Sequence, residues 1–222
     1  MNAGRAVGTL LLAQGIGGFL VNFVLLQPAI SPPGFLVNAA PHATRVGVSA
    51  LLGIVIGAMA AAIAITVFPI FRKYSETMAL WFLALGIAAI SLAAVENGTV
   101  MSLLSLSKAY AASGADPASF EAVRGVVAAS RNWAHYSHLV VGGATLLTFY
   151  AVLYRFTLVP RVLAAFGLVA VLLQLLTVSR PFFGAQVIFF LLAPLGLANL
   201  AVAVWLLVKG FADPDAYAAS RA

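Results

Sequence analysis

Six uninterrupted apolar runs are the feature that most limits how this chain can fold. Each run is close to the roughly 20 residues that an α-helix needs to cross the hydrocarbon core of a bilayer. Lipid allows only helices or closed barrels to span it, and a barrel would show short alternating segments. The sequence therefore predicts an all-α integral membrane bundle, with a single transmembrane domain over residues 1–222. The predicted spans are about 6–27, 45–70, 78–104, 133–154, 160–178 and 186–208.

The composition agrees with a surface that faces lipid. Hydrophobic residues make up 63% of the chain and charged residues 8%, against about 45–50% and about 25% in a soluble domain. The chain contains no cysteine, which excludes disulfides and thiolate metal sites. Its net charge of +6 comes from basic residues scattered among the span ends, so we expect no nucleic-acid partner. The expected partners are the lipid bilayer and either another membrane protein or further copies of this chain in a homo-oligomer.

The basic residues also predict an orientation, because short cytoplasmic loops are enriched in lysine and arginine. With the N-terminus inside, the inner segments hold Arg5, Arg72, Lys73, Arg155, Arg161, Lys209 and Arg221. The outer segments then hold Arg45, Lys108, Arg124, Arg131 and Arg180. We therefore expect a multi-pass protein of a bacterial inner (cytoplasmic) membrane with both termini in the cytoplasm.

The longest connection between predicted spans, about 105–132, is extracytoplasmic in this orientation. Asp116 and Pro117 form a typical helix start, a capping acid followed by proline at the first helical position. Apolar residues then recur on one side, at Phe120, Val123 and Val126. This pattern predicts a short amphipathic helix at the outer interface. The alternative is that the segment extends the fourth span at its N-terminal end.

Glu96 is the one clearly ionisable residue inside a predicted span. An acid at the centre of a membrane helix costs about 2.5–3.5 kcal/mol on insertion scales, so such residues are functional candidates. Glu96 lies roughly 27 Å along the third span from Met78, at about 1.5 Å per residue. This distance places it near the outer interface. The structural alternative is a carboxylate that reaches water or pairs with an arginine there.

The predicted topology brings all three histidines to the same outer end as Glu96. His42 precedes the second span, and His135 and His138 begin the fourth. The i, i+3 spacing of His135 and His138 lets both imidazoles face one direction. Histidine with carboxylate is a donor set for transition metals, so His42, His135, His138 and Glu96 are the candidate metal ligands.

Two other uses of the histidines remain open. A haem would need axial histidines from two helices, and here these are His135 or His138 with His42. A proton-transfer role for Glu96 with a histidine is the other alternative, because histidine titrates near neutral pH. The structural alternative is a set of interfacial histidines bonded to backbone or lipid headgroups.

Other polar and small residues in the spans predict packing. Gly53 and Gly57 form a small-xxx-small pattern that permits close helix approach. Four polar residues are expected to form interhelical hydrogen bonds: Gln14, Asn22, Gln174 and Asn199.

Two stretches of the sequence resemble a known bacterial family. They are YRFTLVPRVL (residues 154–163) and AVWLLVKG (residues 203–210), together with a histidine at the head of the fourth span, His135 or His138. The family is a group of roughly six-span membrane proteins catalogued as a domain of unknown function (DUF4386). The resemblance implies a second histidine where Thr145 stands and an arginine just before Glu96, where Ala93 stands. It implies a fold and assigns no activity.

Three functional hypotheses follow. The first is a non-enzymatic binding or accessory subunit whose polar outer end docks a partner or a small ligand. The second is a membrane-embedded metal- or haem-dependent protein that uses His42, His135, His138 and Glu96. The third is a small proton-coupled carrier with Glu96 as its titrating group. Phosphate-binding loops and the nucleophile-elbow and zinc-protease motifs are absent from the sequence.

Overall fold

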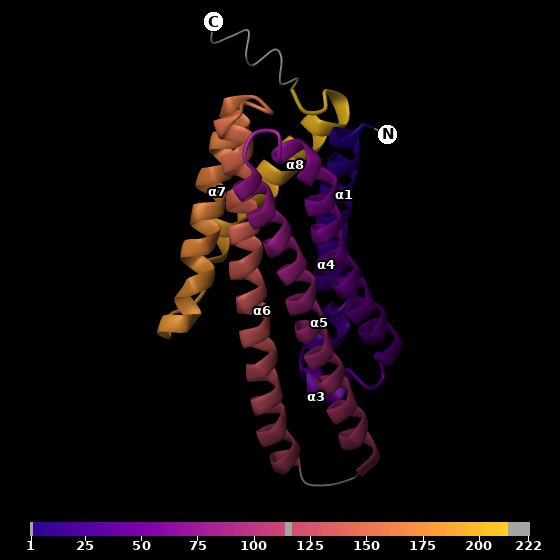
Figure 1. The fold of residues 1–222 in the computed structure, drawn as a ribbon. Coiled ribbons are helices and arrows are strands. Elements are labelled where there is room, and N and C mark those ends of the chain that lie inside the picture. The colour runs from indigo at the N-terminus through magenta and orange to yellow at the C-terminus, as the bar shows by residue number, and fades with distance from the viewer. Residues whose placement is uncertain (1, 114–116, 213–222) are drawn as a thin grey trace, which may run out of the picture. The chain divides into compact units, whose positions relative to one another are not determined.

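The computed structural model describes residues 2–113 and 117–212, and these residues form helices and no strands (Figure 1). The predicted all-α class is therefore confirmed. The α-helices are α1 (Ala3–Phe19), α2 (Gln27–Ile30), α3 (Phe35–Asn38), α4 (Ala43–Phe71), α5 (Glu76–Ser113), α6 (Pro117–Arg155), α7 (Arg161–Ser179) and α8 (Ala193–Val208). A π-helix, η1 (Leu20–Leu25), continues α1, and two 3₁₀ helices, η2 (Arg180–Phe183) and η3 (Phe189–Leu192), lie between α7 and α8.

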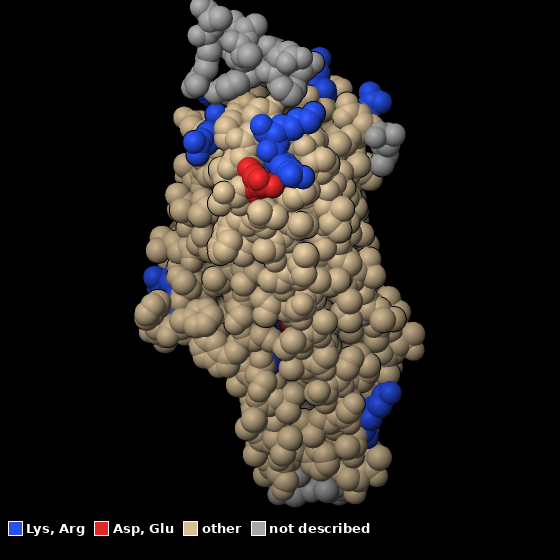
Figure 2. Space-filling view, viewed as in Figure 1, with Lys and Arg blue, Asp and Glu red and all other residues tan. Residues whose placement is uncertain are grey.

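Six of the described helical segments are long and apolar enough to cross a membrane, as the sequence predicted. They are Ala3–Leu25, Ala43–Phe71, Glu76–Ser113, Ala118–Arg155, Arg161–Phe183 and Phe189–Val208. Figure 2 shows one face of the molecule, most of which carries no lysine, arginine, aspartate or glutamate side chain. The chain is a multi-pass membrane protein.

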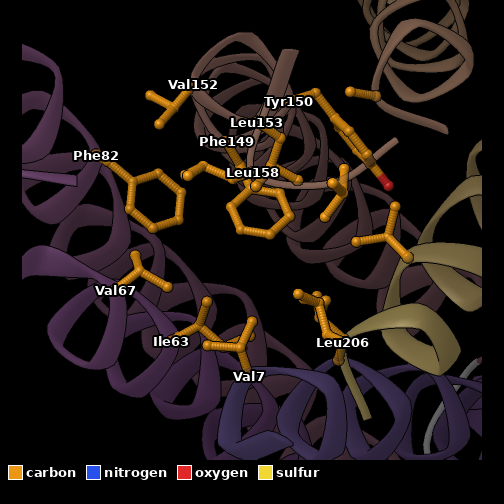
Figure 3. Packing of buried hydrophobic residues seen from close by; sticks show 14 of the residues in the cluster. Val7, Ile63, Val67, Phe82, Phe149, Tyr150, Val152, Leu153, Leu158 and Leu206 are labelled. Carbon is orange, nitrogen blue, oxygen red and sulfur yellow. The ribbon is translucent and has the colours of Figure 1, made fainter. Parts of the chain in front are cut away.

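The fold contains two compact units that share several helices. Unit 1 comprises residues 1–15, 59–89 and 139–222, and unit 2 comprises residues 16–58 and 90–138. In unit 1, all six spans contribute to one apolar core, which includes Val171 of α7. Figure 3 shows other members of this core, among them Val7, Val67, Phe149 and Leu206. Small residues let its helices approach closely. Gly8 of α1 lies against the Ala203 carbonyl of α8, where a Cβ atom would overlap it.

One end of unit 1 gathers the described ends of the chain and two connections. The Tyr74 ring, after α4, lies 4.9 Å from the Phe156 ring, after α6. The Ala212 amide, after α8, donates to the Leu158 carbonyl over 2.9 Å. Gly4 in the first turns of α1 contacts Gly210. Both described ends of the chain therefore lie on the same side of the bundle, as an even number of spans requires.

Unit 2 holds the start of α4 and the second half of α5 against the segment that joins η1 to α4. Val21, Ala39, Val46, Val100 and Leu104 belong to its buried core. Ser107 fixes the joining segment, since its hydroxyl donates to the Leu36 carbonyl and accepts from the Ala40 amide. The Leu36 carbonyl at the end of α3 and the Ala40 amide beyond it thus have partners, which backbone groups in or near lipid require.

The structure corrects the prediction for residues 105–132. Instead of a separate short interfacial helix, α5 continues to Ser113, and α6 runs without a break from Pro117 to Arg155. The predicted helix start at Pro117 is confirmed, whereas its capping partner Asp116 lies outside the described residues. The helix continues because glycine at positions such as Gly125 is tolerated and no proline follows Pro117 before Pro160.

The length of α5 and α6 has a consequence for their position in the membrane. They contain 38 and 39 residues, which corresponds to about 57 Å each at 1.5 Å per residue. The hydrocarbon core is about 30 Å thick, and membrane helices tilt by at most about 40°. Part of each helix must therefore extend beyond the core into the headgroups or water.

Candidate functional site

The candidate site is built around the carboxylate of Glu96, in the part of α5 that belongs to unit 2. Its side chain is only 12% exposed. An acid so deeply buried in a predicted span needs partners, because an isolated charge in a low-dielectric surrounding is strongly unfavourable. The partners come from the antiparallel helix α6.

His135 and His138 each bind one oxygen of this carboxylate. The Nδ1 atom of His135 lies 2.8 Å from Oε1, and the Nδ1 atom of His138 lies 2.9 Å from Oε2. The predicted i, i+3 spacing thus brings both imidazoles to one acceptor. An ionised carboxylate can only accept, so we assign the proton to each Nδ1. In a neutral imidazole, Nε2 on the other side of the ring is then an acceptor.

Arg131 supplies a third hydrogen bond to the same carboxylate. Its Nη2 atom donates to Oε1 over 3.3 Å. Arg131, His135 and His138 follow the i, i+4, i+7 spacing of one helix face, so α6 presents them as a row toward α5. Their side chains are 25%, 33% and 26% exposed, so each remains partly accessible. We refer to Glu96, Arg131, His135 and His138 as the carboxylate cluster.

The neighbours of Glu96 on α5 support the helix itself. Thr99 donates its hydroxyl to the Glu96 carbonyl over 2.6 Å, and the Asn97 amide donates to the Ala93 carbonyl over 2.8 Å. The Asn97 side chain also fills the space beside Gly53 of α4, where a Cβ atom would overlap it. The predicted packing role of Gly53 is therefore confirmed, and it fixes the depth of α4 against α5.

His42 is not part of the carboxylate cluster. Its Nδ1 atom lies 2.9 Å from the Asn38 carbonyl, just before α4 begins. Gly53 of α4 lies beside Asn97, the residue that follows Glu96 on α5. His42 precedes Gly53 by roughly 16 Å along the helix axis, so it lies well away from Glu96. The structure therefore brings together three of the four residues predicted as metal ligands and separates the fourth.

The arrangement of Glu96, His135 and His138 does not support the predicted metal site. Among the residues that the structure describes, no group of three or more histidine, cysteine, aspartate or glutamate side chains is arranged to hold a metal ion. In the cluster, both carboxylate oxygens face protonated Nδ1 atoms instead of sharing a point with ring lone pairs. A carboxylate placed in this way orients the two imidazole rings, as carboxylates beside the histidine ligands of many metal sites do.

Arg131 is the member of the cluster that sequence reasoning did not assign to it. Its place in the predicted outer loop indicated only a role in membrane topology. Its spacing of four residues before His135 is the signal that could have identified it, once α6 is known to begin at Pro117. Arg180, which the predicted topology also assigns to the outer side, donates instead to the Gln186 carbonyl within its own connection.

A comparison with protein families identifies the family of the chain. The model described as Domain of unknown function (DUF4386) matches residues 6–210. The chain belongs to this family. The resemblance inferred from residues 154–163 and 203–210 is thereby confirmed. A search of curated proteins and a search of solved structures each give no match.

The two positions where the resemblance implies other residues lie on the same helices as the cluster. Ala93, where the resemblance implies an arginine, is completely buried on α5. The guanidinium that binds Glu96 comes instead from α6, through Arg131. Thr145, where the resemblance implies a histidine, donates to the Val141 carbonyl of its own helix. Within the described part of the chain, the charged contacts of Glu96 come from α6.

Proposed function

We propose that this DUF4386 protein is a non-enzymatic binding subunit that takes up a small ligand at the carboxylate cluster. One observation carries the proposal: Glu96 holds two partly accessible imidazoles by their Nδ1 atoms, over 2.8 and 2.9 Å. Each ring thus has a fixed orientation and tautomer, and its Nε2 atom remains for a ligand. Binding groups held in this way lose little rotational freedom when a ligand arrives.

Binding is favoured over catalysis by what the neighbouring polar groups do. Asn97 and Thr99, the polar side chains next to Glu96 on α5, donate to backbone carbonyls of their own helix. They therefore support the scaffold, whereas catalysis would need further groups directed at a reacting atom. A divalent metal is disfavoured by the fixed positive charge of Arg131, which already balances the carboxylate.

We further propose that the cluster faces the outside of a bacterial inner membrane. The proposal rests on the end of unit 1 that holds the described chain ends. Six basic residues lie in the helix ends and connections there: Arg5, Arg72, Lys73, Arg155, Arg161 and Lys209. Such enrichment is typical of the cytoplasmic side. Glu96 lies about 30 Å from Glu76 along α5, one hydrocarbon thickness away.

Single-cysteine labelling tests this orientation, since the natural chain has no cysteine. Thr77→Cys and Ala112→Cys introduce thiols at exposed positions near the two ends of α5. In intact cells, a membrane-impermeant maleimide should label Ala112→Cys, and it should label Thr77→Cys only after permeabilisation. The reverse pattern would invert the proposed topology.

A thermal-shift experiment on the purified protein tests the binding proposal. The probes are sodium sulfate, sodium acetate, zinc chloride and tetramethylammonium chloride, each compared at matched ionic strength. A ligand that binds only the folded state raises the melting temperature in proportion to its occupancy. We expect at least one probe to raise it in the natural protein and to do so less in the His135→Gln/His138→Gln variant.

The matched control is His42→Gln, which removes the histidine that lies outside the cluster. It should respond to the probes like the natural protein. Equal responses in all three proteins, or no response to any probe, would refute binding at the carboxylate cluster.

A further inference from the structure

We infer that the ligand of the carboxylate cluster is an oxyanion of the phosphate or sulfate type, bound together with protons on the histidines. This inference rests on the proposed binding function and specifies its ligand class. It follows from the charges around the imidazoles, from the hydrogen-bonding groups that remain, and from the position of the cluster along α5.

The charge of the cluster is zero or positive in every state in which Glu96 is ionised. Arg131 lies 3.3 Å from the carboxylate and balances it when both imidazoles are neutral. Protonation of either histidine then adds a positive charge that the cluster does not balance. An anion gains from this excess charge, whereas a cation would be repelled by it.

No second described carboxylate in unit 2 is placed to neutralise the protonated imidazoles. The other charged residues of the described part of this unit are Arg45 on α4, Lys108 on α5, and Glu121 and Arg124 on α6. Glu121 is paired with Arg124 and precedes His135 by roughly 21 Å along α6. The remaining charged side chains are basic, so the charge on the imidazoles is left for a ligand.

The polar atoms that remain are donors once the histidines are protonated. Each Nδ1–H is used on Glu96, which leaves the Nε2–H groups of His135 and His138. One N–H group of the Arg131 guanidinium donates to Oε1 of Glu96, and the planar guanidinium has further N–H groups. Imidazolium N–H donors close to a guanidinium are groups that bind phosphate-type oxygens.

At its position along α5, the carboxylate cluster can be reached by two kinds of molecule that carry such an oxyanion. At about 30 Å from Glu76 along α5, the cluster lies at the level of lipid headgroups. The phosphodiester of an anionic phospholipid and a free oxyanion both reach this level. The recognised group is the same in the two cases, and the experiment distinguishes the sources.

Sulfate binding measured as a function of pH is the test, because sulfate keeps its charge between pH 6 and pH 8. Isothermal titration of the detergent-purified protein should show sulfate binding about tenfold tighter at pH 6 than at pH 8, because an imidazole that carries both protons offers sulfate a further N–H donor and a positive charge. The His135→Gln/His138→Gln variant should lose this pH dependence. Acetate in place of sulfate should bind more weakly, since it offers fewer oxygens to the donors.

The Arg131→Gln variant tests whether the ligand is negatively charged. It should weaken sulfate binding about tenfold or more at pH 6, as expected for loss of a charge-assisted hydrogen bond. Arg124→Gln, an arginine on the same helix outside the cluster, is the matched control and should leave the affinity unchanged. Thermal unfolding of each variant in the absence of sulfate shows that the protein is folded.

Competition with lipid identifies the source of the oxyanion. If the natural ligand is a headgroup, short-chain phosphatidylglycerol should displace sulfate and short-chain phosphatidylcholine should not. If it is a free oxyanion, neither lipid should displace sulfate. Either result supports the inference. It is overturned if sulfate binding is absent, insensitive to pH, or equal in Arg131→Gln and Arg124→Gln. Histidine-dependent binding of zinc or tetramethylammonium alone would overturn it while leaving the binding function intact.

Discussion

Replacing Gly167 by alanine should lower the melting temperature of the protein by about 5–10 °C, the change expected from about 2–3 kcal/mol of overpacking in a chain of this size. Gly167 of α7 faces the ring of Tyr150 on α6, and an added Cβ atom would overlap three of its ring carbons. Tyr150 is completely buried, and its hydroxyl donates to Asn199 Oδ1 of α8 over 2.7 Å. The ring cannot retreat without breaking this contact.

Gly142→Ala is the matched control for the Gly167 substitution. Gly142 is also helical, on α6, and an added Cβ atom there meets nothing within 4 Å. The same methyl group should therefore be neutral or slightly stabilising, since alanine has the higher helix propensity. The measurement is thermal unfolding in detergent followed by intrinsic fluorescence. Similar melting temperatures for the two variants would show that the Gly167–Tyr150 contact does not hold α6 and α7 together.

The number and order of the spans could be predicted from sequence because both depend on local properties. A run of about 20 apolar residues has few alternatives in lipid, so each run becomes a helix. The ends of α5 and α6 were harder, because apolar character fades near Leu104 while helical backbone continues to Ser113. Apolar side chains indicate where a helix contacts lipid. Where the helix ends depends instead on where a helix-breaking residue such as proline occurs.

The candidate site was predicted in part for a similar reason. Topology assigns a residue to one end of the bundle, but it does not give its lateral position or its exact depth. Glu96, His135 and His138 meet because α5 and α6 are antiparallel neighbours. His42 shares their predicted end and bonds instead to Asn38.

Polar residues inside the spans illustrate the same limit. Asn199 forms the predicted interhelical bond, to Tyr150, and Gln174 of α7 reaches the Leu139 carbonyl of α6 at 3.5 Å. Asn22, for which the same was predicted, donates to the Gly18 carbonyl of its own helical segment. An amide side chain in lipid must find an acceptor, and the sequence alone does not determine whether that acceptor is on another helix.

Glu96→Ala should destabilise the protein by about 3 kcal/mol, the cost typical of removing one partner from a buried ion pair. Three donors of α6 would lose their common acceptor, and the Arg131 charge would remain unbalanced beside α5. Glu121→Ala is the matched control, because Glu121 pairs with Arg124 on an exposed face of α6. That pair should contribute less than about 1 kcal/mol. Thermal or denaturant unfolding of both variants in the same detergent gives the comparison.

A more conservative change separates the orienting role of Glu96 from its contribution to stability. The carboxamide of Glu96→Gln offers one acceptor oxygen and one donor nitrogen, so it can accept an Nδ1–H from only one of the two histidines. The other histidine must turn or move its proton to Nε2. Nitrogen-15 spectra of labelled histidine should therefore show three Nδ1–H rings in the natural protein, including His42, whose Nδ1 faces the Asn38 carbonyl, and two in the variant. An unchanged spectrum would mean that the imidazoles are oriented by something other than Glu96, and the binding proposal would lose the geometry on which it depends.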